Sequence, residues 1–205
     1  MRPSRVFIQA IVLVVAGVYL LAFLIQGLPT TELFAPIGAA SSVAGLLVLA
    51  FDHFLWRFPK IGRTLSKRPN LRGTWRGRLA SNWVDPETEK GVDPEVYLVV
   101  RQTFWSVTAN LITKESKSCS TTATIEDDGC GQHQLVAQYR NTPRASVRER
   151  SEVHHGSFKL DIAGEPVEQM EGYYWTDRMT RGELDFDRHS PKFVESYAHA
   201  QRLNL

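Results

Sequence analysis

Cysteine is scarce in this chain: Cys119 and Cys130 are the only two among 205 residues. Their spacing matches no zinc-binding pattern, and in a reducing compartment we expect both to be free thiols. His154 and His155 are adjacent, but neighbouring residues on a strand point to opposite faces and chelate poorly. The sequence therefore predicts no metal site.

Motifs of catalysis are also missing. The chain has no G-x-S-x-G nucleophile elbow, no H-E-x-x-H zinc motif and no phosphate-binding glycine loop. We expect a protein that is not an enzyme and that needs no cofactor.

The larger part of the chain lacks an excess of positive charge. From Asn70 to Leu205, 17 Lys and Arg stand against 20 Asp and Glu, although the whole chain carries a formal charge of +2. Binding of long nucleic acid needs a broad basic face, so the sequence disfavours such a partner. A small anionic ligand held in one local pocket remains compatible with this balance.

Charges are absent from two N-terminal segments. Val6–Leu28 has 23 residues without a charge, and Leu33–Phe51 has 19. Because a helix needs about 20 apolar residues to cross the hydrocarbon core of a bilayer, we predict two membrane-spanning helices in a hairpin over residues 1–58. A cleaved signal peptide is the alternative for the first segment, but its apolar stretch would be only about 7–15 residues long.

Positive charges flank the predicted hairpin on one side. Arg2 and Arg5 precede the first helix, and the turn at residues 29–32 carries no Lys or Arg. The basic residues after the second helix are Arg57, Lys60, Arg63, Lys67, Arg68 and Arg72. The positive-inside rule places both termini in the cytoplasm. Residues 59–69 are then a basic connector near anionic headgroups.

Beyond the connector, short segments rich in Val, Thr, Tyr, Phe and Trp alternate with Gly, Asn, Asp and Pro, a pattern typical of strands and turns. The eight predicted strands are Gly73–Ser81, Glu95–Thr103, Ser106–Thr113, Ser116–Ile125, His133–Asn141, Val153–Ile162, Val167–Thr176 and Gly182–Arg188. Their short connections indicate an up-and-down β-barrel or a sandwich. We predict an eight-stranded up-and-down β-barrel over residues 70–189, because closure removes exposed strand edges and encloses space for one small ligand.

Residues 190–205 are expected to form a C-terminal tail with a short helix. Ser190 is a suitable N-cap, and Pro191 suits the first helical position. A helix starting there would place Phe193, Val194 and Tyr197 on one face, against the barrel or an interface.

Small residues recur four positions apart in the second uncharged segment. Gly38 and Ser42 have this spacing, as do Ser41 and Gly45. Small side chains on one helix face let two membrane helices approach closely. Two partners fit equally well: another copy of the chain, or the first helix of the same chain.

Polar side chains gather at one end of the predicted barrel. If the strands alternate up and down, several of them place inward-facing polar residues at the end opposite to Trp75, which is expected to close the other end. The predicted ligand site consists of Thr113, Ser118, Tyr139, Asn141, His154, Thr176 and Arg178. An apolar floor with a few convergent polar groups is typical of a small-molecule site. The alternative is that strand ends are polar because they meet solvent.

One strand needs an irregularity to fit this arrangement. Ser118 and Ser120 have the opposite parity to Ala123 and Ile125 along the chain. A β-bulge between the two pairs is required if all four are to point inward.

Six short motifs follow the predicted hairpin in order. They are Gly73-Thr74-Trp75-Arg76-Gly77, Gln102-Thr103-Phe104, Ser116-Lys117-Ser118-Cys119-Ser120, Tyr139-Arg140-Asn141-Thr142-Pro143, His155-Gly156, and the run from Gly172 to Gly182. Their order behind a two-helix anchor resembles the two-transmembrane β-barrel effectors of bacterial CBASS antiphage systems, which are associated with CD-NTase enzymes. The resemblance extends through Arg188.

The resemblance implies a function. The barrel would be the receptor for a cyclic dinucleotide made by a partner CD-NTase cyclase after phage infection. Binding would drive oligomerisation, and the assembled hairpins would disrupt the bacterial inner membrane. Arg178 is suited to the ligand's phosphates, and Tyr139 is available to stack on a base. The alternative is a membrane-tethered barrel that binds a lipid or metabolite without toxicity.

Overall fold

The computed structural model describes residues 5–26, 35–58, 68–84, 91 and 93–203. The chain divides into two compact units, Met1–Arg68 with Thr103–Trp105, and Pro69–Gln102 with Ser106–Leu205. Residues 1–4, 29–32 and 59–67 lie outside the described residues. Most of the basic connector and part of the flanking charge pattern therefore stay predictions.

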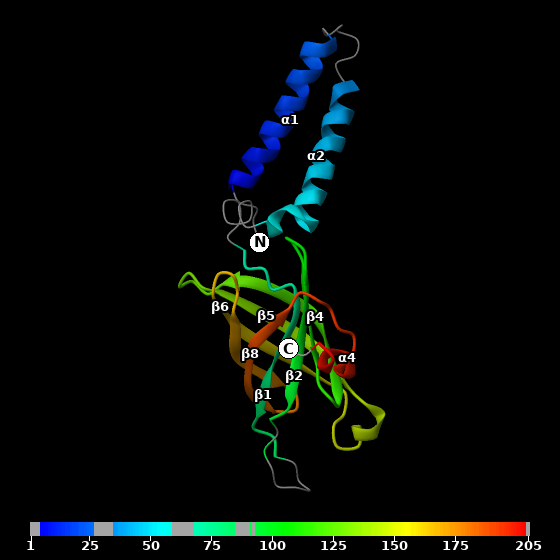
Figure 1. Cartoon of the computed structure of the whole chain (residues 1–205), viewed down its shortest axis with the longest axis vertical. Helices are drawn as coiled ribbons and strands as arrows, with labels where there is room; N and C mark the ends of the chain where they lie inside the picture. The colour runs from blue at the N-terminus through cyan, green and yellow to red at the C-terminus, as the bar shows by residue number, and fades with distance from the viewer. Residues whose placement is uncertain (1–4, 27–34, 59–67, 85–90, 92, 204–205) are drawn as a thin grey trace. The chain divides into compact units, whose positions relative to one another are not determined.

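The first unit contains two helices, α1 (Arg5–Gln26) and α2 (Ala35–His53), followed by the short 3₁₀ helix η1 (Leu55–Arg57). The two helices overlap the two uncharged N-terminal segments of the sequence: α1 begins at Arg5, one residue before the first segment, and α2 continues to His53, two residues past the second (Figure 1). Over the residues that the structure describes, no helix combines the length and the hydropathy needed to cross a membrane.

Residues 103–105 belong to the first unit through contacts at the end of α2. Phe51, Trp56 and Phe104 form a buried aromatic cluster. The backbone N–H of Phe104 donates to the carbonyl oxygen of Asp52 over 2.9 Å, and that of Trp105 donates to the Asp52 carboxylate over 3.0 Å. One aspartate thus satisfies two backbone donors of this turn.

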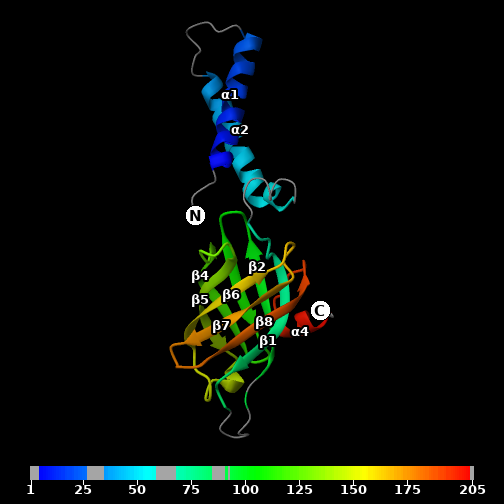
Figure 2. The same ribbon diagram turned by 90° about the vertical axis from the view of Figure 1, so that its left-hand side faces the viewer.

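The second unit is a closed antiparallel barrel in which each strand pairs with the next and β8 pairs with β1. The strands are β1 (Gly73–Ser81), β2 (Glu95–Gln102), β3 (Val107–Ile112), β4 (Ser116–Asp127), β5 (His133–Pro143), β6 (His154–Ala163), β7 (Gln169–Thr176) and β8 (Arg181–Ser190). Figure 2 shows β8 lying between β7 and β1. The predicted barrel is confirmed, and a two-layered sandwich is ruled out.

The β-bulge predicted in β4 is present. Its pairing with β5 shifts register between Ser120 and Thr122. Thr121 is the additional residue, and its hydroxyl donates to the Gln138 carbonyl over 3.2 Å. The bulge restores the parity of the strand, so that Ser118 and Ile125 are both buried.

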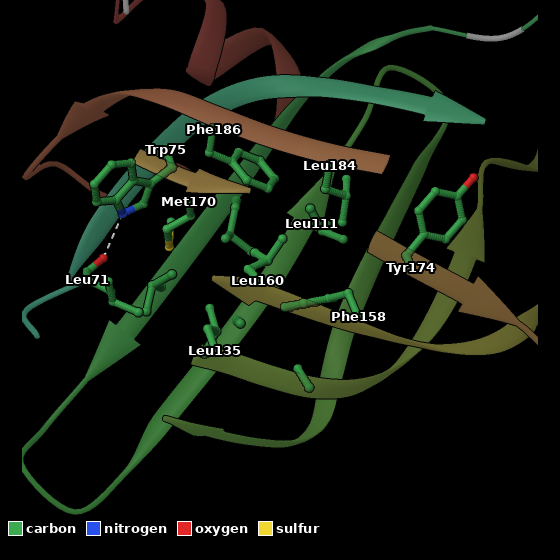
Figure 3. Close-up of a cluster of buried hydrophobic side chains, with 14 of the residues drawn as sticks. Leu71, Trp75, Leu111, Leu135, Phe158, Leu160, Met170, Tyr174, Leu184 and Phe186 are labelled. Carbon is green, nitrogen blue, oxygen red and sulfur yellow. Dashed lines mark hydrogen bonds between the residues drawn. The ribbon is translucent and has the colours of Figure 1, made fainter. Parts of the chain in front are cut away.

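One end of the barrel is closed by the chain that enters β1. Leu71 and Trp75 are 0% and 1% exposed, and the Trp75 indole N–H donates to the Leu71 carbonyl over 2.9 Å. Gln102 accepts from the Leu71 backbone N–H and donates to the Pro69 carbonyl, both over 2.9 Å. Figure 3 shows Leu71 and Trp75 at one end of the apolar core and Tyr174 at the other.

The C-terminal helix starts later than the sequence suggested. Ser190 is not an N-cap, because β8 continues to it and it pairs with Thr74 of β1. Helix α4 (Tyr197–Gln201) is capped instead by Ser196, whose hydroxyl accepts from the His199 backbone N–H. Val194 and Ala200 pack on outward-facing residues of β2 and β3. The pairing of β8 with β1, which closes the barrel, outweighs the local preference of Pro191 for the first position of a helix.

Candidate functional site

A cavity of about 180 Å³ lies at the end of the barrel where β1 ends and β8 begins. Its lining includes all seven residues of the predicted ligand site, namely Thr113, Ser118, Tyr139, Asn141, His154, Thr176 and Arg178. It is the end opposite to Trp75 and Leu71, as the alternating strand directions require. Residues from five separate parts of the chain, all predicted from the sequence pattern, therefore meet in one cavity.

Strand pairing explains why these side chains meet. Asn141 of β5 lies directly opposite Ser118 of β4 on one side and His154 of β6 on the other. Residues in register on neighbouring antiparallel strands point to the same face and lie within contact distance. The three polar side chains thus form a row across the inner face of the cavity.

Asn141 is the centre of the polar network. Its side-chain Nδ2 donates to the hydroxyl of Ser118 over 2.8 Å and to that of Ser116 over 3.0 Å. Its carbonyl oxygen Oδ1 is buried and has no hydrogen-bond partner among the residues that the structure describes. The residue as a whole is 8% exposed. An amide with both donors used and its acceptor unused is therefore held inside the cavity.

Two threonines of the cavity stabilise turns. The Thr113 hydroxyl oxygen accepts from the backbone N–H groups of Ser116 and Glu115, over 2.9 and 3.2 Å. The hydroxyls of Thr176 and Thr180 lie 2.6 Å apart. These contacts fix the β3–β4 and β7–β8 turns at the edge of the cavity.

Two tyrosines provide the aromatic part of the wall. The Tyr139 ring stacks on Phe158, with centroids 6.0 Å apart. The Tyr174 hydroxyl donates to the Ser81 hydroxyl over 2.8 Å. Burial raises the pKa of both phenols, most strongly that of Tyr139. Both therefore stay neutral at physiological pH and add no negative charge to the site.

His154 is also kept neutral. Its Nδ1 lies 2.9 Å from the Glu152 carbonyl oxygen, and its side chain is nearly buried. Burial lowers the pKa of His154 below the usual 6.5, and the neighbouring Arg178 lowers it further, whereas Glu152 and Asp177 oppose the shift. The positive charge of the cavity wall therefore comes from arginine rather than from this histidine.

Arg178 lies at the edge of the cavity, in the β7–β8 turn. Its guanidinium donates to the Ser151 hydroxyl over 3.2 Å, and both residues line the cavity. The carboxylate of Glu115, on the same edge, pairs with Arg150 at 2.6 Å. The edge thus holds a guanidinium suited to a phosphate and a carboxylate that is already bound to another arginine.

Several lining residues were not in the predicted set. Ser116 and Tyr174 share the inward parity of their predicted neighbours, so the strand register does predict both at this end of the barrel, and the structure places them in the cavity wall. Ser151 and Val147 come from the loop between β5 and β6. No periodic pattern places a loop residue, so the sequence offered no signal for them.

The four small residues predicted for helix packing are exposed in the first unit: Gly38, Ser41, Ser42 and Gly45. The Ser42 hydroxyl donates to the Gly38 carbonyl within the helix, over 2.9 Å. A Cβ built on Gly38 or Gly45 meets no described atom within 4 Å. The described part of the chain therefore leaves space beside this face of α2.

Cys119 and Cys130 are free and exposed. Among the described residues, no group of three or more His, Cys, Asp or Glu side chains is placed to hold a metal ion.

Comparisons with known proteins agree with this geometry. Residues 66–188 match the family model described as "Cap15, cyclic dinucleotide receptor domain". The chain is also similar to CD-NTase-associated protein 15 of Yersinia aleksiciae, with 34% identity over 163 residues, covering 77% of this chain and 72% of that protein. The family match includes every residue of the predicted ligand site.

Proposed function

This chain belongs to the family of Cap15 cyclic dinucleotide receptor domains, and on that basis we propose that its barrel binds a cyclic dinucleotide as part of a CBASS antiphage response. A CD-NTase cyclase supplies the ligand. The protein acts by binding rather than by catalysis.

The observation that carries the proposal is the cavity at one end of the barrel. Its wall combines two aromatic rings, the polar row of Ser118, Asn141 and His154, and the guanidinium of Arg178 at the edge. A cyclic dinucleotide needs these features: aromatic surface for a base, hydrogen-bonding groups for its edge, and positive charge for phosphate.

We further propose that α1 and α2 anchor the protein in the bacterial inner membrane with both termini in the cytoplasm. The support is the two uncharged segments of 23 and 19 residues, together with large apolar side chains that are exposed in the helices, such as Leu13 at 72%, Leu24 at 69% and Leu46 at 66%. Exposed apolar surface of this extent is typical of a membrane or protein contact.

The effector step in this proposal is self-association. Ligand binding promotes contact between the α2 helices of several copies through Gly38, Ser41, Ser42 and Gly45, and the assembled helices disrupt the bilayer. The open space beside Gly38 and Gly45 supports this role, because small residues allow close helix approach in lipid.

The binding proposal is tested by calorimetric titration of the full-length protein in detergent with cyclic dinucleotides of guanine, adenine and uracil. At least one should bind, and a linear dinucleotide of the same bases should bind more weakly. Absence of binding by every cyclic dinucleotide would refute the receptor function.

The effector proposal is tested in cells. Co-expression of the full-length chain with a cyclase that makes the bound nucleotide should arrest growth and depolarise the membrane, and replacement of Gly38 and Gly45 by leucine should prevent both effects. Ligand binding without depolarisation would contradict membrane disruption and favour a tethered receptor without toxicity.

A further inference from the structure

A groove lies on the outer wall of the barrel, over β2, β3 and the start of β4. Its volume is about 340 Å³, and its floor consists of Val99, Ile112 and Val194, which are all buried. The other lining residues are Arg101, Asn110, Lys117 and Glu195. None of these residues lines the cavity at the end of the barrel, so the groove is a separate feature of the fold.

Basic side chains dominate the rim of this groove. Arg101 and Lys117 are exposed there, against one carboxylate, that of Glu195. The Arg101 guanidinium lies 5.0 Å from the ring centroid of Phe193, and the Arg72 guanidinium lies 4.9 Å from the same centroid. The C-terminal segment that borders the groove thus holds two guanidinium groups on this side of the barrel through cation–π contacts. An occupant with negative charge is therefore favoured.

An exposed aromatic pair lies on the opposite side of the barrel. Tyr173 and Trp175 are 53% and 45% exposed on the outward face of β7, and their ring centroids are 5.8 Å apart. In the closed ring of strands, β7 is four strands away from β3 in either direction, so the pair and the groove face opposite ways. Tyrosine and tryptophan are enriched at protein–protein interfaces, where they act as anchors.

Carboxylates surround this pair on the outward face of β6, β7 and β8, which we call the aromatic wall. In the strand register, Tyr173 lies between Lys159 and Glu183, and Arg181 lies beside Trp175. The residues of the next row, all carboxylates, are Asp161, Glu171 and Asp185. The wall thus carries four carboxylates against two cations, and its net charge is opposite to that of the groove rim.

We infer that the groove binds the aromatic wall of a second copy of this chain. Tyr173 and Trp175 of one copy contact Arg101 and Lys117 of the next, because aromatic faces attract cations, and Glu183 adds complementary charge. The groove volume of about 340 Å³ lies within the range of pockets that enclose a small molecule, so an aromatic side chain fits. The inference goes beyond the proposed function, which places the contact between copies in α2.

The contact joins two different surfaces, so it is heterologous. A bound pair keeps one groove and one aromatic wall unoccupied. Because the two surfaces lie on opposite sides of the ring, further copies add at either end and form an open row of barrels. A symmetric contact would instead stop at a dimer.

The test is cysteine cross-linking of the full-length chain in detergent, without ligand and with cyclic dinucleotides of guanine, adenine and uracil added in turn. Native Cys119 is exposed and lies in register with Asn110 of the groove. The reporter chain keeps Cys119 and carries Cys130→Ser and Arg181→Cys, which places a second thiol in register with Trp175. Since β4 and β8 are four strands apart, a short bismaleimide links these two thiols only between copies.

The reporter chain should give a ladder of covalent dimers, trimers and longer products in at least one condition. Lys117→Glu and Trp175→Ala should each lower the cross-linked fraction about fivefold or more, because like charges repel across an interface and an aromatic anchor is lost. Both residues are exposed, so neither change should unfold the barrel. Arg144→Glu makes a comparable charge change on the exposed β5–β6 loop and is the matched control, which should keep the ladder.

Two results would overturn the inference. One is a reporter chain that gives no ladder in any condition, or whose ladder is unchanged by Lys117→Glu and Trp175→Ala. The other is a symmetric contact: chains with Cys119 alone, or with Arg181→Cys and Cys119→Ser, should remain single on a denaturing gel, and covalent dimers at the level of the reporter chain would contradict a heterologous contact. Either result leaves the receptor function standing, because nucleotide binding is measured separately by titration.

Discussion

Gly156 of β6 lies directly against the ring of Tyr139 of β5. A Cβ at Gly156 would be 2.5 Å from the Tyr139 hydroxyl oxygen and 2.7 Å from the backbone carbonyl oxygen of Trp175. The two residues are paired in register across the strands. Only a residue without a side chain allows the tyrosine ring to approach β6 this closely, so this glycine positions one of the two tyrosines that line the cavity.

Gly156→Ala should displace Tyr139 and strain the contact with β7. We expect a loss of about 1–3 kcal/mol in the free energy of unfolding, as for other overpacked sites, and weaker binding of the cyclic dinucleotide. Denaturant unfolding and titration measure the two effects. Gly91→Ala is the control, because an added Cβ there meets no described atom within 4 Å. Unchanged stability and affinity in Gly156→Ala would contradict the positioning role.

Arg178→Ala should weaken ligand binding and leave the fold intact, because the side chain is exposed and, among the described residues, donates one hydrogen bond, to Ser151. Hydrogen bonds to charged groups contribute about 1.5–3 kcal/mol, so the dissociation constant should rise by at least about tenfold. Arg140→Ala, on the outward face of β5, should bind normally. Equal affinities for the two variants would place the ligand's phosphates elsewhere.

Acid should destabilise the protein through His154. Its folded-state pKa lies below 6.5 because of burial, so below that pH the unfolded chain takes up a proton that the folded chain resists. Stability is therefore full above pH 6.5 and falls as the pH drops toward the folded-state pKa. His154→Gln should flatten the dependence of the melting temperature on pH in this window, whereas the exposed neighbour His155→Gln should retain it. An unchanged slope in His154→Gln would refute this source of acid sensitivity.

Trp75→Phe should affect stability without affecting the ligand site. The change leaves the buried Leu71 carbonyl without its indole donor, which costs about 1–3 kcal/mol, and the smaller ring adds a cavity cost. Because Trp75 lies at the opposite end of the core from Tyr174, the affinity of the folded protein for its ligand should not change. Urea unfolding measures the loss of stability, and titration measures the affinity for the ligand. A loss of affinity in the folded variant would contradict the independence of the two ends of the barrel.

Strand parity made most of the barrel and its cavity predictable. Once the strands were taken as alternating up and down, residues such as Ser118 and Tyr139 had to face inward at the same end, and the structure places them there. The bulge at Thr121 was predictable for the same reason, since parity before and after it could not otherwise agree.

Contacts between residues far apart in the sequence explain the features that local sequence patterns did not predict. Ser190 and Pro191 have the local preferences of a helix start, but the pairing of Ser190 with Thr74 extends β8 instead. Ser151 lines the cavity because of the path of the β5–β6 loop. A loop has no repeating pattern of inward and outward residues from which this position could be predicted. The hydrogen bonds of the Asn141 side-chain amide depend on two serine hydroxyls of another strand, and no spacing along the chain encodes that.

Pairing of β1 with β8 completes the hydrogen-bonding of the described strands around the ring. An open sheet could recruit a neighbour by extending its ladder of backbone amides, whereas here each of the eight described strands has a paired neighbour on both sides. In the proposed self-association, contacts through side-chain surfaces or helices are therefore favoured over a continuous sheet. Hydrogen exchange of the strand amides should accordingly be as slow in an assembled state as in a single copy, with new protection confined to segments outside the strands.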